Sequence, residues 1–133
     1  MAHWLFKSDP DAYGWPELAK DKQTVWDGVS NPVALRNLRS CKKGDQVFIY
    51  HTGDEKAIIG IAEITKEAYP DPKKKEDKLV VVEIKAIKKI GRPVALSEIK
   101  AQKDFADFAL VRLPRLSVMP VDEKQWRKIL SMV

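Results

Sequence analysis

The stretch "KAIIGIAEITKEAY", residues 56–69, decides the fold because its apolar run predicts a strand in the middle of the chain. Gly60 at its centre indicates a β-bulge or a close approach of another part of the chain. The preceding stretch "DQVFIYHTG", residues 45–53, predicts another strand, and "LVVVEIKAI", residues 79–87, predicts a long strand that follows. Three strands in succession, with no helix between them, therefore form the predicted centre of the protein.

Toward the N-terminus the sequence predicts one more strand and two helices. Residues 3–7, "HWLFK", read as a strand, and residues 11–20 have room for a short helix. Residues 30–41, "SNPVALRNLRSC", predict a longer helix in which Asn31 is the N-cap and Pro32 is the first helical residue. The N-terminal third is therefore expected to place two helices before the central strands.

Toward the C-terminus, residues 91–101 predict a turn and a short helix, and residues 110–121 predict an extended segment broken by prolines. A last helix is expected after Asp122, which suits the N-cap, with Gln125 in the capping-box position. Its expected apolar stripe is Trp126, Ile129, Leu130 and Val133.

This order mixes strands and helices without a regular strand–helix–strand alternation. It predicts an α+β fold, a small mixed barrel with peripheral helices, rather than a doubly wound parallel sheet. The length of 133 residues favours one domain. Because neither a repeat nor a linker interrupts the chain, residues 1–133 are expected to form that single domain.

Composition limits the classes of partner. The single Cys41 excludes an internal disulfide, and one Cys with two His is too few for a usual zinc site, so no metal or cofactor is predicted. No apolar run approaches the roughly 20 residues that cross a bilayer, and the first residues lack a secretory leader's features. We therefore expect no membrane partner and a cytoplasmic location. The net charge of +5 mildly favours an anionic partner such as nucleic acid.

Sequence motifs of common enzymes are missing: the chain has no G-x-G-x-x-G, no Walker loop and no G-x-S-x-G. Three polar features keep two interpretations each. His51 either bonds a nearby backbone group or stands at the mouth of a pocket. Lys7 is either solvated or, together with Ser8, presents a charged donor and a hydroxyl to a ligand. The lysine-rich loop 72–78 is either solvated or contacts phosphates.

The four tryptophans differ in their surroundings. Trp126 fits an apolar stripe and is expected in the core, Trp4 is expected in the core or half-buried, and Trp15 is expected to pack at the surface. Trp26 lies between two turns, outside any apolar periodicity. It is either part of an ordinary helix entrance or the wall of a pocket, because aromatic planes are how proteins hold unstacked bases.

Six segments, in this order along the chain, resemble the EVE domain, a PUA-like family related to the YTH domain. They are "HWLFKSDP" (3–10), "VWDGVSNPVAL" (25–35), "KKGDQVFIYHTG" (42–53), "IIGIAEI" (58–64), "AYPDP" (68–72) and "RLSVMPV" (115–121). The resemblance implies a PUA-like six-stranded mixed pseudo-barrel with helices around it. It also implies a non-catalytic module that accepts a modified base, methylated or hydroxymethylated, in DNA or RNA.

The resemblance further implies which residues form the site. Trp26 would stack on a flipped base, and Lys7 and Ser8 would line the floor or rim of the pocket. The other implied contacts are Gly28, Val29 and Asn31 for the polar base edges, Tyr50, His51 and Thr52 on the opposite side, Tyr69 and Pro70 as a lid, and Arg115 and Ser117 from the last strand.

Two positions depart from the family pattern. Ser30 and Leu35 stand where the family often has arginine, which removes the basis for a phosphate contact by this segment. Two other function classes stay open. One is an ASCH-type amidohydrolase acting on a modified nucleoside, with Lys7 as nucleophile or base and Glu63 as its partner. The other is an accessory protein of a larger complex, with an empty pocket.

Overall fold

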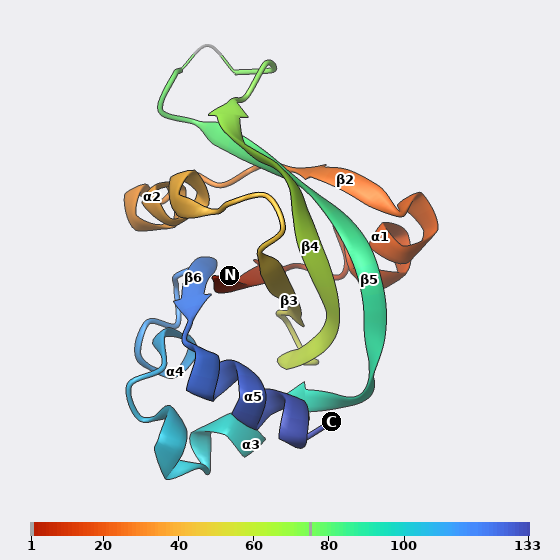
Figure 1. The fold of residues 1–133 in the computed structure, drawn as a ribbon, viewed down its shortest axis with the longest axis vertical. Helices are drawn as coiled ribbons and strands as arrows, with labels where there is room; N and C mark the ends of the chain where they lie inside the picture. Colours follow the sequence, from red (N-terminus) through yellow and green to blue (C-terminus); the bar gives the residue numbers. More distant parts are fainter. Residues whose placement is uncertain (1, 75) are drawn as a thin grey trace.

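The computed structural model describes residues 2–74 and 76–133, which form a curved six-stranded sheet with helices packed around it (Figure 1). The strands are β1 (His3–Ser8), β2 (Gln23–Trp26), β3 (Gln46–His51), β4 (Ala57–Pro70), β5 (Val80–Ala95) and β6 (Val118–Val121). The helices are α1 (Trp15–Asp21), α2 (Pro32–Ser40), α3 (Leu96–Lys100), α4 (Ala109–Arg112) and α5 (Glu123–Ser131), with a 3-10 turn, η1 (Lys103–Phe105). In this part of the chain no helix is long and apolar enough to cross a membrane.

The strand order is β2-β5-β4-β3-β1-β6, and the predicted central strands β3, β4 and β5 lie side by side as an antiparallel meander. β1 runs parallel to β3, while all other neighbours are antiparallel. A parallel pair needs a long connection, and α1, β2 and α2 together provide it. The predicted α+β class and the six-stranded mixed pseudo-barrel are confirmed.

The sheet curls until its two ends approach each other. β1 and β2 are separated by three strands in the sheet order, yet the ring centroids of Phe6 in β1 and Trp26 in β2 lie only 5.5 Å apart. β2 and β6 each pair with one neighbour only, so the barrel keeps a seam between β2 on one side and β1 with β6 on the other. The candidate functional site lies at this seam.

The expected position of Trp26 between two turns is wrong. Trp26 is the last residue of β2, pairs with Val82 of β5, and exposes only 9% of its surface. The strand is four residues long and lies at the edge of the sheet, where Val25 remains 44% exposed. So short an edge strand shows no apolar alternation in the sequence. The segment is a strand because it pairs with β5.

Gly60 fulfils both predictions made for it. The pairing register of β4 shifts between Ile58 and Gly60, which is a bulge, and the ring of Trp15 lies against Gly60 so closely that a Cβ there would come within 2.5 Å of it. The expectation that Trp15 packs at the surface is therefore wrong. Only 5% of Trp15 is exposed, because the missing side chain of Gly60 leaves room for the indole.

Three C-terminal expectations also need correction. Residues 91–95 continue β5 instead of turning, and Val94 and Ala95 pair with Ile58 and Ala57 at the start of β4. Part of the segment 110–121 is helical, in α4, before β6 begins. Leu130 is 36% exposed because α5 turns only Trp126 and Ile129 into the core, and Val133, 44% exposed, lies beyond the end of α5 at Ser131.

The predicted helix starts are confirmed. Asn31 Oδ1 accepts hydrogen bonds from the amides of Val33 and Ala34, at 2.9 and 3.1 Å. At α5, Asp122 Oδ1 accepts from the amide of Gln125 at 2.7 Å, and Gln125 Oε1 accepts from the amide of Asp122 at 3.2 Å. The Asn31 cap fixes the point at which the chain leaves the seam and enters α2.

Candidate functional site

A cavity of about 670 Å³ opens at the seam of the barrel, and we call it the Trp26 cavity. Its volume lies within the range of small-ligand sites. It is lined by Lys7, Ser8, Asp9, Ala12, Tyr13, Thr24, Val25, Trp26, Asp27, Gly28, Val29, Lys73 and Ser117. Because the sheet curls, three strands meet at this cavity. They contribute the end of β1, residues 24–26 of β2 and the residue before β6.

Trp26 and Ser8 form the deepest part of the cavity, since they expose only 9% and 8% of their surfaces. Trp26 rests against Phe6 in the core. The Ser8 hydroxyl donates to the carbonyl oxygen of Tyr13, which ties the end of β1 to the turn before α1. The wall is therefore aromatic and held in place from behind, as a binding site for a flat ligand requires.

Lys7 supplies the cation of the site. Its Nζ donates to the carbonyl oxygen of Pro114 at 2.7 Å and lies 5.8 Å from the ring centroid of Tyr50. Burial lowers the pKa of Lys7, and no carboxylate of the described residues comes within 4.0 Å of it. An ammonium group has three hydrogens to donate, so Pro114 leaves two for a ligand.

The segment 27–30 contributes backbone amides. Gly28 has φ = +77°, a conformation that side chains other than glycine rarely adopt. Within residues 2–74 and 76–133, no protein group accepts a hydrogen bond from the four amides of this segment. Gly28 and Val29 line the cavity, so their amides are available to a polar ligand edge.

The rim carries charges of both signs, from Asp9, Asp27 and Lys73. Lys73 comes from the loop between β4 and β5, where its amide donates to Oδ1 of the buried Asp71 at 2.9 Å. The sequence shows a lysine-rich loop at residues 72–78 but does not place it at this cavity. The pairing of β2 with β5 brings the loop there, because Trp26 and Val82 lie opposite each other.

Six of the thirteen implied site residues line the Trp26 cavity: Lys7, Ser8, Trp26, Gly28, Val29 and Ser117. Tyr13, Thr24, Val25 and Lys73 line it as well and were not expected. Thr24 and Val25 belong to the strand that the sequence did not reveal. The signal in the sequence that could have identified them as cavity residues is their position directly before Trp26.

Asn31 and Arg115 lie on a neighbouring groove of about 330 Å³, which we call the Leu113 groove. It is lined by Asn31, Val33, Arg112, Leu113, Pro114, Arg115 and Leu116. The side-chain oxygen of Asn31 is committed to the amides of α2, as described above. Neither residue lines the Trp26 cavity itself.

Tyr50, His51 and Thr52 lie behind the cavity wall rather than in its lining. Only 3% of Tyr50 is exposed, beneath the Lys7 ammonium. His51 Nε2 accepts a hydrogen bond from the amide of Trp15 at 2.9 Å, so the proton is on Nδ1, which lies 3.1 Å from Glu55 Oε1. The amide of Thr52 donates to the carbonyl oxygen of Ser8. These contacts hold β1, β3 and α1 together.

Tyr69 and Pro70 end β4 outside the lining of the Trp26 cavity. The Tyr69 hydroxyl donates to Glu83 Oε2 at 2.7 Å, and this bond raises the pKa of Tyr69 to about 12. Pro70 is exposed and pairs with Val80. Lys73, three residues further on, is the part of this segment that reaches the cavity.

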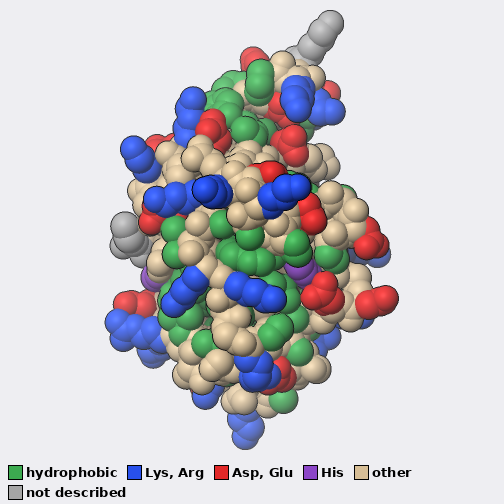
Figure 2. All heavy atoms as spheres, turned by 90° about the vertical axis from the view of Figure 1, so that its right-hand side faces the viewer, with side chains coloured by type: hydrophobic (Ala, Val, Ile, Leu, Met, Phe, Trp, Pro, Cys, Tyr) green, Lys and Arg blue, Asp and Glu red, His purple; other side chains and the backbone are tan. Residues whose placement is uncertain are grey.

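Charge on the β5 side of the molecule is mixed. Figure 2 shows Lys and Arg side chains on this face with Asp and Glu side chains between them. Lys85 Nζ lies 3.4 Å from Glu63 Oε2, and Lys66 Nζ lies 4.0 Å from Glu83 Oε2. This face therefore offers no continuous basic surface of the kind that binds phosphates.

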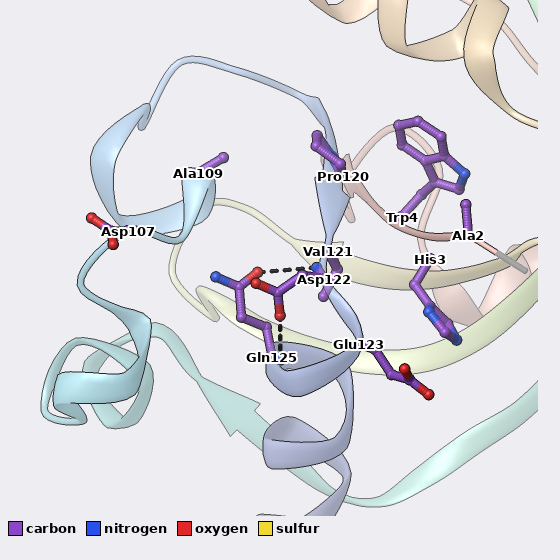
Figure 3. Close-up of a pocket in the computed structure, with 10 residues that line it drawn as sticks. All are labelled: Ala2, His3, Trp4, Asp107, Ala109, Pro120, Val121, Asp122, Glu123 and Gln125. Carbon is purple, nitrogen blue, oxygen red and sulfur yellow. Dashed lines mark hydrogen bonds between the residues drawn. The ribbon is translucent and has the colours of Figure 1, made fainter.

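A second cavity, of about 590 Å³, lies where β1 and β6 meet the start of α5 (Figure 3). Its rim carries three carboxylates, from Asp107, Asp122 and Glu123, which would repel a phosphate. The Asp122 and Gln125 side chains are occupied with the cap of α5. The Trp26 cavity is therefore the better candidate for an anionic ligand. In the described part of the chain, no cluster of three His, Cys, Asp or Glu could hold a metal ion.

Comparison with known proteins places the chain among its relatives, because the family model of the EVE domain matches residues 2–132. The chain belongs to the EVE domain family. Human thymocyte nuclear protein 1 is 31% identical to this EVE domain, over 98% of this chain and 73% of the human protein. The NMR structure of a Rhodopseudomonas palustris protein aligns with a TM-score of 0.94 at 40% identity, over 99% of this chain and 92% of that chain.

Two further solved structures are similar to this EVE domain. The crystal structure of human THYN1 protein in complex with 5-methylcytosine containing DNA aligns with this EVE domain with a TM-score of 0.87 at 30% identity, over 99% of this chain and 97% of that chain. An ASCH protein of Zymomonas mobilis aligns with a TM-score of 0.56 at 16% identity, over 98% of this chain and 97% of that chain. The second likeness shows a shared fold alone.

The Lys7–Glu63 pair expected for an amidohydrolase is not formed in this EVE domain. Lys7 lies opposite Tyr50 on β3, whereas Glu63 lies opposite Gln46, four residues away along the same strand. Four residues of a strand span roughly 13 Å. The Glu63 carboxylate is instead beside the Lys85 ammonium.

Proposed function

We propose that this EVE domain is a non-catalytic module that takes one modified base of DNA or RNA, methylated or hydroxymethylated, into the Trp26 cavity. The observation that carries the proposal is the cavity itself, where a buried tryptophan, a half-buried lysine and backbone amides without an acceptor among the described residues meet. The human relative in complex with 5-methylcytosine containing DNA supports it at 30% identity. Six of the thirteen residues implied by the family resemblance line this cavity, which supports the same site.

The geometry suits a base that has left its stack. Flipping a base out of a duplex costs a few kcal/mol, and less from a single strand. Contact with the Trp26 ring returns about 1–3 kcal/mol. The two remaining hydrogens on Lys7 Nζ and the amides of Gly28 and Val29 are donors for carbonyl oxygens and ring nitrogens of the base. Lys73 at the rim is placed for the neighbouring phosphate.

Discrimination between modified and plain bases needs more than burial. One buried methyl group is worth only about 0.8 kcal/mol, which is less than a factor of ten in affinity. Thr24 therefore matters, because it borders the cavity and lies two residues before Trp26 in β2, so the Thr24 and Trp26 side chains are on the same face of the strand. We assign the shape of the modification pocket to these two residues.

Several finer statements belong to this proposal. Residues 1–133 act as one EVE domain, with the YTH-like use of an aromatic wall, and RNA is a candidate ligand beside DNA. Tyr50, His51, Thr52, Tyr69 and Pro70 serve as support behind the wall. Asn31 and Arg115 serve the adjoining Leu113 groove. The cytoplasmic location expected from the sequence stays a prediction.

The test compares two nine-nucleotide single strands that differ only in one central 5-methylcytosine, as DNA and as RNA, by fluorescence anisotropy at low salt. Wild type is expected to prefer a modified strand. Trp26→Ala is expected to lose tenfold or more in affinity. Because Trp26 also packs on Phe6, Trp26→Phe and Thr24→Val provide milder changes whose folding is checked by thermal melting.

Trp126→Phe is the matched control, since it changes a tryptophan that is equally buried but lies in α5, outside the cavity. It is expected to bind as wild type does. Equal binding of modified and plain strands by wild type, or unchanged binding by a folded Trp26 variant, would overturn the proposal. Turnover of N4-acetylcytidine that Lys7→Ala abolishes would favour the amidohydrolase instead.

A further inference from the structure

The Leu113 groove exposes large apolar side chains next to the proposed base site. Leu113 is 51% exposed and Val33 is 40% exposed, although both are large aliphatic residues on the surface of a small protein. Together with the ring of Pro114 they border the groove from two elements, the start of α2 and the turn after α4. Exposed apolar side chains that gather around a hollow mark a binding surface more often than scattered ones do.

The groove and the Trp26 cavity are adjacent, as three connections between their lining residues show. Lys7 Nζ, in the cavity, lies 2.7 Å from the carbonyl oxygen of Pro114, in the groove. Ser117 of the cavity follows Leu116 of the groove in the chain. Val29 of the cavity is two residues before Asn31 of the groove, and two residues span at most about 7 Å. A ligand that fills the cavity and extends along this surface therefore enters the groove.

Two arginines give the groove its charge. Arg115 is exposed, and no carboxylate of the described residues lies within 4.0 Å of it. Arg112 lies 3.8 Å from Asp107, but both side chains are mostly exposed, so this pair is weak. Guanidinium groups beside an apolar floor match a nucleotide, whose base face is apolar and whose phosphate accepts two hydrogen bonds from arginine.

We propose that the Leu113 groove binds the nucleotide adjacent to the one whose base enters the Trp26 cavity. Its base rests on Val33, Leu113 and Pro114, and its phosphate contacts Arg115. The inference rests on the proposed function, because it assigns the second nucleotide of the same strand. It also gives the domain a phosphate contact although Ser30 and Leu35 stand where the family resemblance implies arginine.

The test measures binding of the same nine-nucleotide strands, and of three-nucleotide strands with the same centre, by Val33→Ser, Leu113→Ser and Arg115→Ala. The serine variants are expected to lose about tenfold in affinity for both modified and plain strands, because each removes apolar surface that the base would cover. Arg115→Ala is expected to reduce the slope of log affinity against log salt concentration by about one. The ratio of affinities for modified and plain strands stays at its wild-type value, because the modification is read in the cavity.

The matched controls are Leu130→Ser and Arg127→Ala, which remove an exposed leucine and an exposed arginine from α5. They are expected to bind as wild type does. Wild-type affinity in all three groove variants would overturn the inference. A failure of the proposed function is a different result: wild type would then bind modified and plain strands equally, whatever the groove variants do.

Discussion

Gly60 and Trp15 share a space that admits only one side chain. An alanine Cβ at position 60 would lie 2.5 Å from the Trp15 ring, so the indole would have to move. We expect Gly60→Ala to lower the free energy of unfolding by about 1–3 kcal/mol, as overpacked core substitutions do. Urea unfolding followed by fluorescence measures it.

Gly91→Ala is the matched control for this substitution. Gly91 is also a strand glycine, but a Cβ there meets no atom within 4 Å. We expect a change of less than about 0.5 kcal/mol, as for other exposed substitutions. If Gly60→Ala unfolds at the same urea concentration as wild type, Trp15 can shift without a loss of stability.

Cys41 is a buried thiol with no exposed surface, and its Sγ lies 3.5 Å from the carbonyl oxygen of Asn37. Burial raises the pKa of Cys41, so the reactive thiolate is scarce at neutral pH. We expect the native protein not to react with Ellman's reagent and the guanidinium-unfolded protein to react fully. Rapid reaction of the native protein would contradict the burial of Cys41.

At the scale of elements, one arginine joins three of them. Arg92 in β5 donates to both carboxylate oxygens of Glu98 in α3, at 2.9 and 2.8 Å, and to the carbonyl oxygen of Met132 at the end of α5, at 2.7 Å. A bidentate arginine–carboxylate pair has a defined geometry and is stronger than a single contact. This cluster fastens the helical end of the molecule, where Figure 1 shows α3, α4 and α5 together, to the sheet.

The hydrogen bonds from Arg92, and then that from the amide of Ala95, lower the pKa of Glu98. A carboxyl whose pKa is lower in the folded state stabilises the fold above its unfolded pKa, and this contribution disappears as the pH falls through the folded pKa. We therefore expect Glu98→Gln to be less stable than wild type at pH 7 and the difference to shrink below about pH 4. Urea midpoints between pH 7 and pH 2.5 measure it. A constant difference over this range would contradict the ion pair's contribution.

At the scale of the whole molecule, the position of charge matters more than its sum. The net charge is +5, but the β5 face mixes both signs and the cavity in Figure 3 is bordered by carboxylates. Along the Trp26 cavity and the Leu113 groove, the cations that have no carboxylate of the described residues within 4.0 Å are Lys7, Lys73 and Arg115. A nucleic acid strand bound along these two hollows would meet these cations.

Two exposed lysines test this distribution. Lys73 lies at the cavity rim and Lys100 ends α3, and each substitution by glutamine removes the same charge. We expect Lys73→Gln to reduce the slope of log affinity against log salt by about 0.7–0.9, the loss of one phosphate contact. Lys100→Gln is expected to leave the slope unchanged. Equal slopes for both variants would mean that net charge alone attracts the strand.

Local sequence determined much of the fold. The central strands, the caps at Asn31 and Asp122, and the bulge at Gly60 were all predictable, because each depends on neighbours within a few residues. The family resemblance added the barrel and those cavity residues that lie in the segments carrying the resemblance. β2 was not predictable, since a four-residue edge strand has too few positions for a pattern.

The sequence by itself determined the family and the α+β class, and it suggested the candidate site around Lys7, Ser8 and Trp26 that we propose. Only the tertiary structure decided that β2 closes toward β1, that Lys73 reaches the cavity from a distant loop, and that His51 holds the start of α1. The physical reason is that local structure depends on nearby residues, whereas a cavity at a barrel seam depends on how far the whole sheet curls. That curl is fixed by contacts such as Phe6 with Trp26, between residues far apart in the chain.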